Sequence, residues 1–223
     1  MRLAIGVPCT DGVHTDFAFA LAGITMRQTA FKQLALIKGQ ASISAAKARN
    51  NLVYGAKSIG ATHLLMLDSD MIFPLDTIDR LAAHNVPIVG CIYRRRNEPF
   101  ELMGRVEGRE VTEEPLEGLV KMDLLPTGVM LVQMSVFDKI EKPWFKNDIR
   151  AYNGEMTIGG EDIIFCEEAR KAGFGVWCDA DLSNEVGHLC QATLTVQGMQ
   201  MSSNVAGFQR VSDKSDSTRR SSQ

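Results

Sequence analysis

The sequence predicts an α/β fold, with a mixed but mainly parallel sheet covered by helices on both faces. Short apolar runs alternate along the first ninety or so residues with longer segments whose apolar residues recur at helical spacing. Such alternation is typical of a parallel-cored sheet, because each return to a parallel strand needs a crossover connection. The unbroken apolar run at residues 64–67 is typical of a strand buried on both faces.

Length and composition indicate an ordinary globular protein. The 223 residues suit one domain, and we expect it to span residues 1–207, followed by a polar, disordered tail at 208–223. A net charge of −3 gives no reason to expect nucleic acid as a partner, and no apolar run approaches the ~20 residues of a membrane span. Five cysteines without a CxxC pair indicate reduced thiols in a cytoplasmic protein.

The first half of the chain contains the most regular segments. Pro8 ends the first apolar run, Ser42 or Ser44 is a suitable N-cap for the second helix, and Gly60 is a suitable residue to end it. We expect strands at residues 3–7, 33–38, 64–67 and 86–93, and helices at residues 14–26, 42–59 and 75–84.

The second half is less regular. Residues 97–118 are rich in Gly, Pro and Glu and predict short hairpins or a mobile loop. Trp144, Phe145 and Tyr152 mark a loop, where they fill core or stack on an acceptor sugar, with core the preferred interpretation. We expect strands at residues 119–125, 128–134 and 176–178, a short helix at 136–140, and a helix at 163–172.

Two carboxylates end the third predicted strand. Asp68 and Asp70 are separated by one residue at the carboxyl end of a strand, which is where open α/β sheets bind ligands. Crowded carboxylates repel each other, and Mn²⁺ or Mg²⁺ relieves that repulsion because both ions prefer oxygen ligands. The simpler alternative is a solvated turn or a helix cap, which Asp and Ser also favour.

Two further groups stand out downstream. Glu161 and Asp162 follow a Gly-Gly pair and open a predicted helix, so they either belong to a site or complement the helix dipole. His188 is either a structural residue or a third metal ligand.

Taken together, these motifs resemble the nucleotide-sugar-dependent glycosyltransferases of the GT-A fold over about residues 1–190. The first strand AIGVPCTDG matches the segment that meets the nucleotide base, and AAKARNNLV matches the helix that faces the nucleotide. LLMLDSDMIFP matches the DxD motif, GGEDIIF matches the later xED motif, and EVGHL matches the C-terminal His that completes the metal shell.

The resemblance implies a role for each matched residue. The donor would be a UDP- or GDP-linked sugar, the cofactor Mn²⁺ or Mg²⁺, and the acceptor an unidentified sugar, protein or lipid-linked molecule. Asp162 would be the general base in an inverting reaction and has other roles in a retaining one, with Glu161 beside it. The implied metal ligands are Asp68, Asp70 and His188. The implied donor-binding residues are Pro8, Cys9, Thr10, Asp11, Arg49, Asn50, Asp68 and Ser69.

Other functions remain open at this stage. A phosphohydrolase of the haloacid dehalogenase type also has DxD after a strand, but normally near the N-terminus and followed by Thr or Val where this chain has Ile72. A nucleotidyltransferase usually has a GxGxR segment that this chain lacks. An inactive sugar-nucleotide-binding module is a further alternative. Arg94, Arg95 and Arg96 match no motif of the family, and they form a solvated edge or meet an anion.

Overall fold

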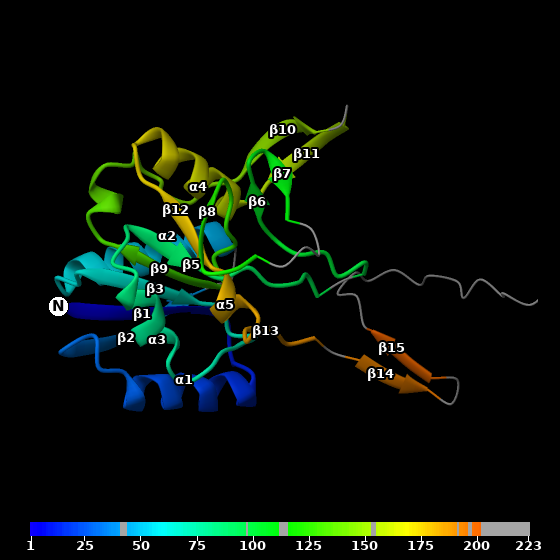
Figure 1. The fold of residues 1–223 in the computed structure, drawn as a ribbon, viewed down its shortest axis with the longest axis horizontal. Helices are drawn as coiled ribbons and strands as arrows, with labels where there is room; N and C mark the ends of the chain where they lie inside the picture. The colour runs from blue at the N-terminus through cyan, green and yellow to red at the C-terminus, as the bar shows by residue number, and fades with distance from the viewer. Residues whose placement is uncertain are drawn as a thin grey trace, which may run out of the picture.

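The computed structural model describes residues 1–40, 44–96, 98–111, 116–152, 155–190, 192–195 and 198–201. Its centre is a seven-stranded sheet with the order β2-β1-β3-β9-β5-β12-β8 (Figure 1). The strands are β1 (Arg2–Cys9), β2 (Gln33–Gln40), β3 (His63–Leu67), β5 (Ile88–Gly90), β8 (Leu119–Met122), β9 (Val129–Gln133) and β12 (Val176–Asp179).

The sheet is mixed and mainly parallel, as the sequence predicts. β1 pairs in parallel with β2 and β3, and β12 pairs in parallel with β5. β9 runs antiparallel between β3 and β5, and β8 runs antiparallel to β12 at the edge. The carboxyl ends of β1, β3 and β5 therefore meet at one edge of the sheet.

Helices cover both faces of this sheet. Figure 1 shows α1 (Thr15–Arg27) and α3 (Thr77–Ala83) on one side, with α2 (Ala45–Ser58) and α4 (Glu161–Lys171) on the other. Successive β3 residues face opposite sides, so Leu64 and Met66 join the core cluster under α2 and α4. Leu65 and Leu67 join the cluster under α1 and α3. The apolar run is thus a strand buried on both faces.

Most predicted elements of the sheet and its helices form within a few residues of their expected ends. Ser44 is the N-cap of α2, and its hydroxyl accepts a hydrogen bond from the Lys47 N–H. The other suggested cap, Ser42, lies outside the described residues. The short helix expected at residues 136–140 is a 3₁₀ turn, η1 (Val136–Asp138).

The structure adds several short elements to the predicted order. The expected hairpin within residues 97–118 is β6 (Arg105–Val106) with β7 (Arg109–Glu110). Part of the segment interpreted as a loop is a hairpin of β10 (Asp148–Tyr152) with β11 (Glu155–Gly159). The remaining new elements are β4 (Met71–Ile72), β13 (Gly187–His188), β14 (Ala192–Thr195), β15 (Gly198–Met201) and α5 (Ala180–Ser183).

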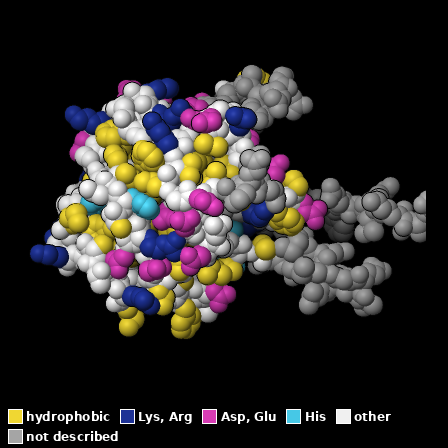
Figure 2. All heavy atoms as spheres, viewed as in Figure 1, with side chains coloured by type: hydrophobic (Ala, Val, Ile, Leu, Met, Phe, Trp, Pro, Cys, Tyr) yellow, Lys and Arg dark blue, Asp and Glu magenta, His cyan; other side chains and the backbone are white. Residues whose placement is uncertain are grey.

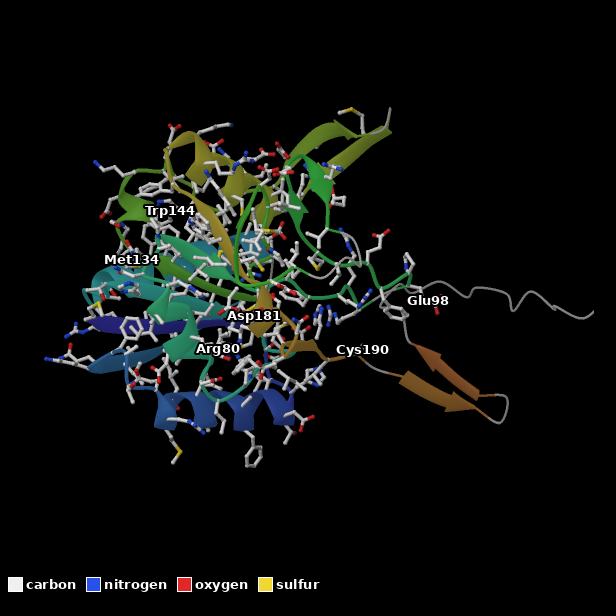
Figure 3. The ribbon with its side chains drawn as sticks, viewed as in Figure 1. Arg80, Glu98, Met134, Trp144, Asp181 and Cys190 are labelled. Atoms are coloured by element: carbon white, nitrogen blue, oxygen red, sulfur yellow. The ribbon has the colours of Figure 1, made fainter. Side chains whose placement is uncertain are left out.

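The aromatic residues before that hairpin belong to the core, as preferred from the sequence. Trp144 and Phe145 are fully or almost fully buried, and the Trp144 indole donates to the Phe137 carbonyl at 2.8 Å. Figure 3 labels Trp144 and Met134, which lie on the same side of the molecule. The side chain of Tyr152 lies outside the described residues.

Four further expectations concern the cysteines, membrane spans, surface charge and the C-terminal tail. All five cysteines are unpaired, and Cys91, Cys166 and Cys178 are buried. No helix in the described residues is long and apolar enough to cross a membrane. Acidic and basic side chains are interspersed on the face shown in Figure 2. Both the predicted tail and the domain boundary at residue 207 lie outside the described residues.

Candidate active site

Several of the predicted site residues lie at the carboxyl edge of the sheet. β3 ends at Leu67, and Asp68 to Asp70 turn back into the short strand β4. The turn is fixed by two backbone hydrogen bonds, from Asp68 N–H to the Gly128 carbonyl at 2.9 Å and from Met71 N–H to the Asp68 carbonyl at 3.1 Å. A hollow of about 340 Å³ opens beside the turn. It is lined by Gly12, Val13, His14, Ser69, Asp70 and Arg96.

Asp70 and His188 lie together, although 118 positions separate them in the sequence. β13 pairs antiparallel with β4, which places His188 opposite Met71. The Leu189 N–H also donates to the Asp70 carbonyl at 2.7 Å. As a result, His188 Nε2 lies 3.4 Å from Asp70 Oδ2, and both side chains are about 15% exposed.

The orientation of the His188 ring makes this pair suitable for a cation. Its Nδ1 lies 2.9 Å from the Arg94 carbonyl, which can only accept, so Nδ1 carries the ring proton. In a neutral ring Nε2 is then an acceptor, and it faces an oxygen of the Asp70 carboxylate, which is also an acceptor. The contact between these two atoms becomes favourable only when a proton or a metal ion lies between them. The 3.4 Å separation is close to the roughly 3 Å between adjacent ligands of an octahedral ion with bonds of about 2.1 Å.

The charges around Asp70 favour its ionised form. Burial alone raises the pKa of this carboxyl group. The hydrogen bond and charge of His188 and the charge of Arg96 outweigh the burial, and the pKa lies below its ordinary value. Asp70 is therefore a ready ligand for a cation at neutral pH.

Asp68, the other carboxylate of the motif, is bound to a buried arginine. Arg49 Nη2 lies 3.0 and 3.1 Å from the two Asp68 oxygens, and Arg49 Nε lies 3.2 Å from Glu161 Oε1. The sequence predicts that Arg49 faces the nucleotide, whereas these contacts make it a link between the end of β3 and the start of α4. Among the described residues, no three His, Cys, Asp or Glu side chains form a ready-made metal site.

Arg49 itself is nearly inaccessible. Its side chain is 5% exposed, and its Nη1 atom is buried without a hydrogen-bond partner. Burial alone lowers the pKa of the guanidinium, but the charges of Asp68 and Glu161 outweigh it and raise the pKa. The side chain is therefore a permanent cation whose charge is balanced by two carboxylates.

Asp162 follows in the first turn of α4, where its Oδ1 accepts from the Ile163 N–H at 2.8 Å. Burial and the negative charge of Glu161 raise its pKa above the ordinary value. Its carboxylate therefore accepts a proton more readily than an ordinary aspartate does. A second hollow, of about 420 Å³, lies along α4. It is lined by Arg105, Glu107, Gly108, Asp123, Leu124, Ile163, Glu167 and Arg170.

The remaining predicted donor residues have different surroundings. Pro8 and Cys9 end β1 half-buried, and Thr10 and Asp11 are exposed beyond it, next to the Gly12 that lines the first hollow. The Asn50 amide is bonded instead to the Phe145 backbone, donating to its carbonyl at 2.7 Å and accepting from its N–H at 3.3 Å. These bonds explain Asn50 without a ligand, so its predicted donor role has no support in the contacts.

Tyr93 was not predicted as a site residue, whereas Arg96 is one of the three arginines expected to form a solvated edge or to meet an anion. The buried hydroxyl of Tyr93 accepts from the Gly128 N–H at 2.9 Å, close to Asp68. Arg96 Nη1 lies 2.7 Å from Asp70 Oδ2. Both residues follow β5 in the sequence, after Cys91 and Ile92, and this position beyond the carboxyl end of a buried strand was the available signal.

No protein-family model and no curated protein matches the chain. Among solved structures, A197 from STIV is similar with a TM-score of 0.60 and 14% identity, over 96% of this chain and 100% of A197.

S. aureus TarS 1-349 in complex with UDP-GlcNAc is similar with a TM-score of 0.50 and 15% identity, over 84% of this chain and 58% of that one. A second crystal structure, of S. aureus TarS 1-349, is similar with a TM-score of 0.51 and 14% identity, over 84% of this chain and 60% of that one. The match therefore spans less than two thirds of the TarS chain. At these identities the similarities show the fold alone, and it is the GT-A-like fold that the sequence predicts.

Proposed function

We propose that the protein is a metal-dependent glycosyltransferase that moves a sugar from a UDP- or GDP-linked donor to an acceptor hydroxyl. The observation that carries the proposal is the Asp70–His188 pair, two acceptor atoms 3.4 Å apart at the carboxyl edge of the sheet. Such a pair favours a cation, and a hollow of about 340 Å³ beside it has room for donor groups. The fold shared with TarS, which is described with UDP-GlcNAc bound, supports the same class of donor.

The proposed chemistry uses residues already placed. Mn²⁺ or Mg²⁺ held by Asp70 and His188 would neutralise the charge that grows on the leaving nucleoside diphosphate. The Arg94 carbonyl keeps the His188 ring oriented, and Arg49 holds Asp68 at the end of β3. In an inverting reaction, Asp162 accepts the proton of the acceptor hydroxyl.

The phosphohydrolase alternative is weaker on the same geometry. In that class the first Asp of the motif must attack a phosphoryl group. Here both oxygens of Asp68 accept from Nη2 of one guanidinium group, at 3.0 and 3.1 Å, and this positive charge lowers their nucleophilicity.

The test of donor binding is a thermal-shift screen of UDP, GDP and other nucleoside diphosphates, with and without Mn²⁺. Ligand at about 100 times its Kd stabilises the folded state by roughly 2.7 kcal/mol, which a melting curve resolves. We expect one base to stabilise the protein, more strongly with Mn²⁺, and the Mn²⁺-dependent part to disappear in Asp70→Ala.

Asp16→Ala is the matched control, because Asp16 is an exposed carboxylate on α1. This variant should keep the full Mn²⁺-dependent shift. A shift that survives in Asp70→Ala contradicts the metal site, and the absence of any nucleotide-induced shift in the wild type contradicts the proposed donor.

A further inference from the structure

The three consecutive arginines after β5 border the proposed metal site. The Arg95 N–H donates to the Glu101 carbonyl at 2.9 Å, and the Met103 N–H donates to the Tyr93 carbonyl at 2.9 Å. These bonds fix the backbone of the segment. The Arg94 carbonyl can therefore hold His188, and the Arg96 side chain extends from a fixed point toward Asp70.

Arg96 and His188 approach the same oxygen atom. Arg96 Nη1 lies 2.7 Å from Asp70 Oδ2, and His188 Nε2 lies 3.4 Å from that oxygen. A metal ion bound by Asp70 and His188 has to approach Oδ2 as well. Two cations would then share one carboxylate oxygen, and their mutual repulsion disfavours keeping both.

Arg96 is the partner that can move. Its side chain is 41% exposed, while those of Asp70 and His188 are about 15% exposed. It also lines the hollow of about 340 Å³, together with Ser69 and His14. A guanidinium group that turns away from Asp70 remains beside this hollow, where its donors can bind two phosphate oxygens at once.

We propose that Arg96 is a movable counter-ion of Asp70. In the protein without ligands it neutralises Asp70. When a metal ion and a nucleoside diphosphate enter, it leaves Asp70 and binds the diphosphate. This inference depends on the proposed function and adds a consequence to it: the metal ion alone must compete with Arg96, whereas the nucleotide gives Arg96 another anion, so the two ligands bind cooperatively.

The test measures two affinities in purified full-length protein. Mn²⁺ binding without nucleotide is followed by the electron paramagnetic resonance signal of free Mn²⁺, and nucleoside diphosphate binding at saturating Mn²⁺ is followed by calorimetry. Arg96→Met removes the charge and keeps an unbranched stem. We expect it to bind Mn²⁺ alone about tenfold more tightly and the nucleotide about tenfold more weakly, within the usual range of coupling between sites.

Two further variants sharpen the result. Arg95→Met is the matched control, since the hydrogen bond of Arg95 to Glu101 comes from its backbone, and both of its affinities should equal those of the wild type. Arg96→Lys keeps a charge but lacks the planar fork, so it should resemble the wild type for Mn²⁺ and bind the nucleotide more weakly.

The outcomes separate the two proposals. If the wild type binds a nucleoside diphosphate with Mn²⁺ and Arg96→Met changes neither affinity, the counter-ion role is wrong while the proposed function stands. The role is equally wrong if Arg96→Met weakens Mn²⁺ binding. If the wild type binds no nucleoside diphosphate, the proposed function fails and the role of Arg96 fails with it.

Discussion

At the scale of single residues, the surroundings of Asp162 favour its acceptance of a proton. Burial and the charge of Glu161 raise its pKa, so the folded protein holds a proton there more firmly than the unfolded chain does. Because the folded-state pKa is the higher one, the stability that Asp162 contributes is complete below its ordinary pKa. That contribution is lost as the pH rises through the raised value, and at neutral pH the ionised carboxylate lowers the free energy of unfolding.

Replacing Asp162 by Asn should therefore separate stability from catalysis. The amide oxygen can still accept from the Ile163 N–H, while the basicity is gone. We expect Asp162→Asn to melt at the same or a higher temperature at pH 7, to bind nucleotide and Mn²⁺ normally, and to lose about 100- to 10,000-fold in transfer rate.

The measurements are melting curves, calorimetry and a transfer assay once an acceptor is known. In the wild type the transfer rate should rise with pH through the raised pKa of Asp162. Loss of nucleotide binding in Asp162→Asn would show that Asp162 belongs to the donor site and is not the general base. An unchanged transfer rate would leave Asp162 as a residue that only opens α4.

At the scale of elements, Arg49 connects three of them. It belongs to α2 and binds Asp68 at the end of β3 and Glu161 at the start of α4, with its own side chain 5% exposed. Removing one member of a buried ion pair leaves an uncompensated charge, and this usually costs more than the pair contributes. Removing the Arg49 guanidinium leaves two carboxylates, Asp68 and Glu161, without their shared cation.

Arg49→Met should consequently reduce the free energy of unfolding by about 3 kcal/mol, a value for breaking a buried pair whose partners are in part solvated. Chemical denaturation gives the value. In a Glu161→Gln background, Arg49→Met should reduce the free energy of unfolding by less, because only the carboxylate of Asp68 then lacks its cation. Equal losses in the two backgrounds would show that Glu161 is not coupled to Arg49.

The elements also show which contacts a sequence can predict. The buried run at Leu64 to Leu67 and the Ser44 cap carry local signals, and both formed as expected. The β4–β13 pairing has two residues on each strand, too few for any period. No local pattern therefore predicted that His188 would lie beside Asp70, although its chemistry and the family resemblance both made it a candidate metal ligand. For the β10–β11 hairpin a signal existed, because an Asn-Gly pair lies between the two strands in the sequence.

Side-chain pairing within the site was the least predictable feature. AAKARNNLV matches the family's helix with an Arg and an Asn that face the nucleotide, yet nothing in those letters shows that Arg49 turns to two carboxylates or that Asn50 binds the Phe145 backbone. Those partners come from β3, α4 and a distant loop, so the contacts depend on tertiary packing.

At the scale of the whole molecule, the hydrophobic core ends earlier in the sequence than the candidate active site does. Up to Cys190, the part of the chain in which side-chain burial is described, the buried apolar side chains lie between Leu3 and Leu182. The site extends slightly further, because His188 and the Leu189 N–H complete it. Residues 212–223 contain no apolar side chain and have nothing to contribute to a core.

Two truncations should separate these roles. Deleting residues 212–223 should leave the melting temperature and nucleotide affinity within error of the full chain. Deleting everything from Gly187 onward removes β13 and His188 but keeps both core clusters, so a cooperative melting transition should persist while Mn²⁺-dependent nucleotide binding is lost. Melting curves of both truncated proteins measure their stability, and calorimetry measures their nucleotide affinity. A lower melting temperature in the shorter deletion would show that the tail packs on the domain, and retained nucleotide binding in the longer one would remove His188 from the donor site.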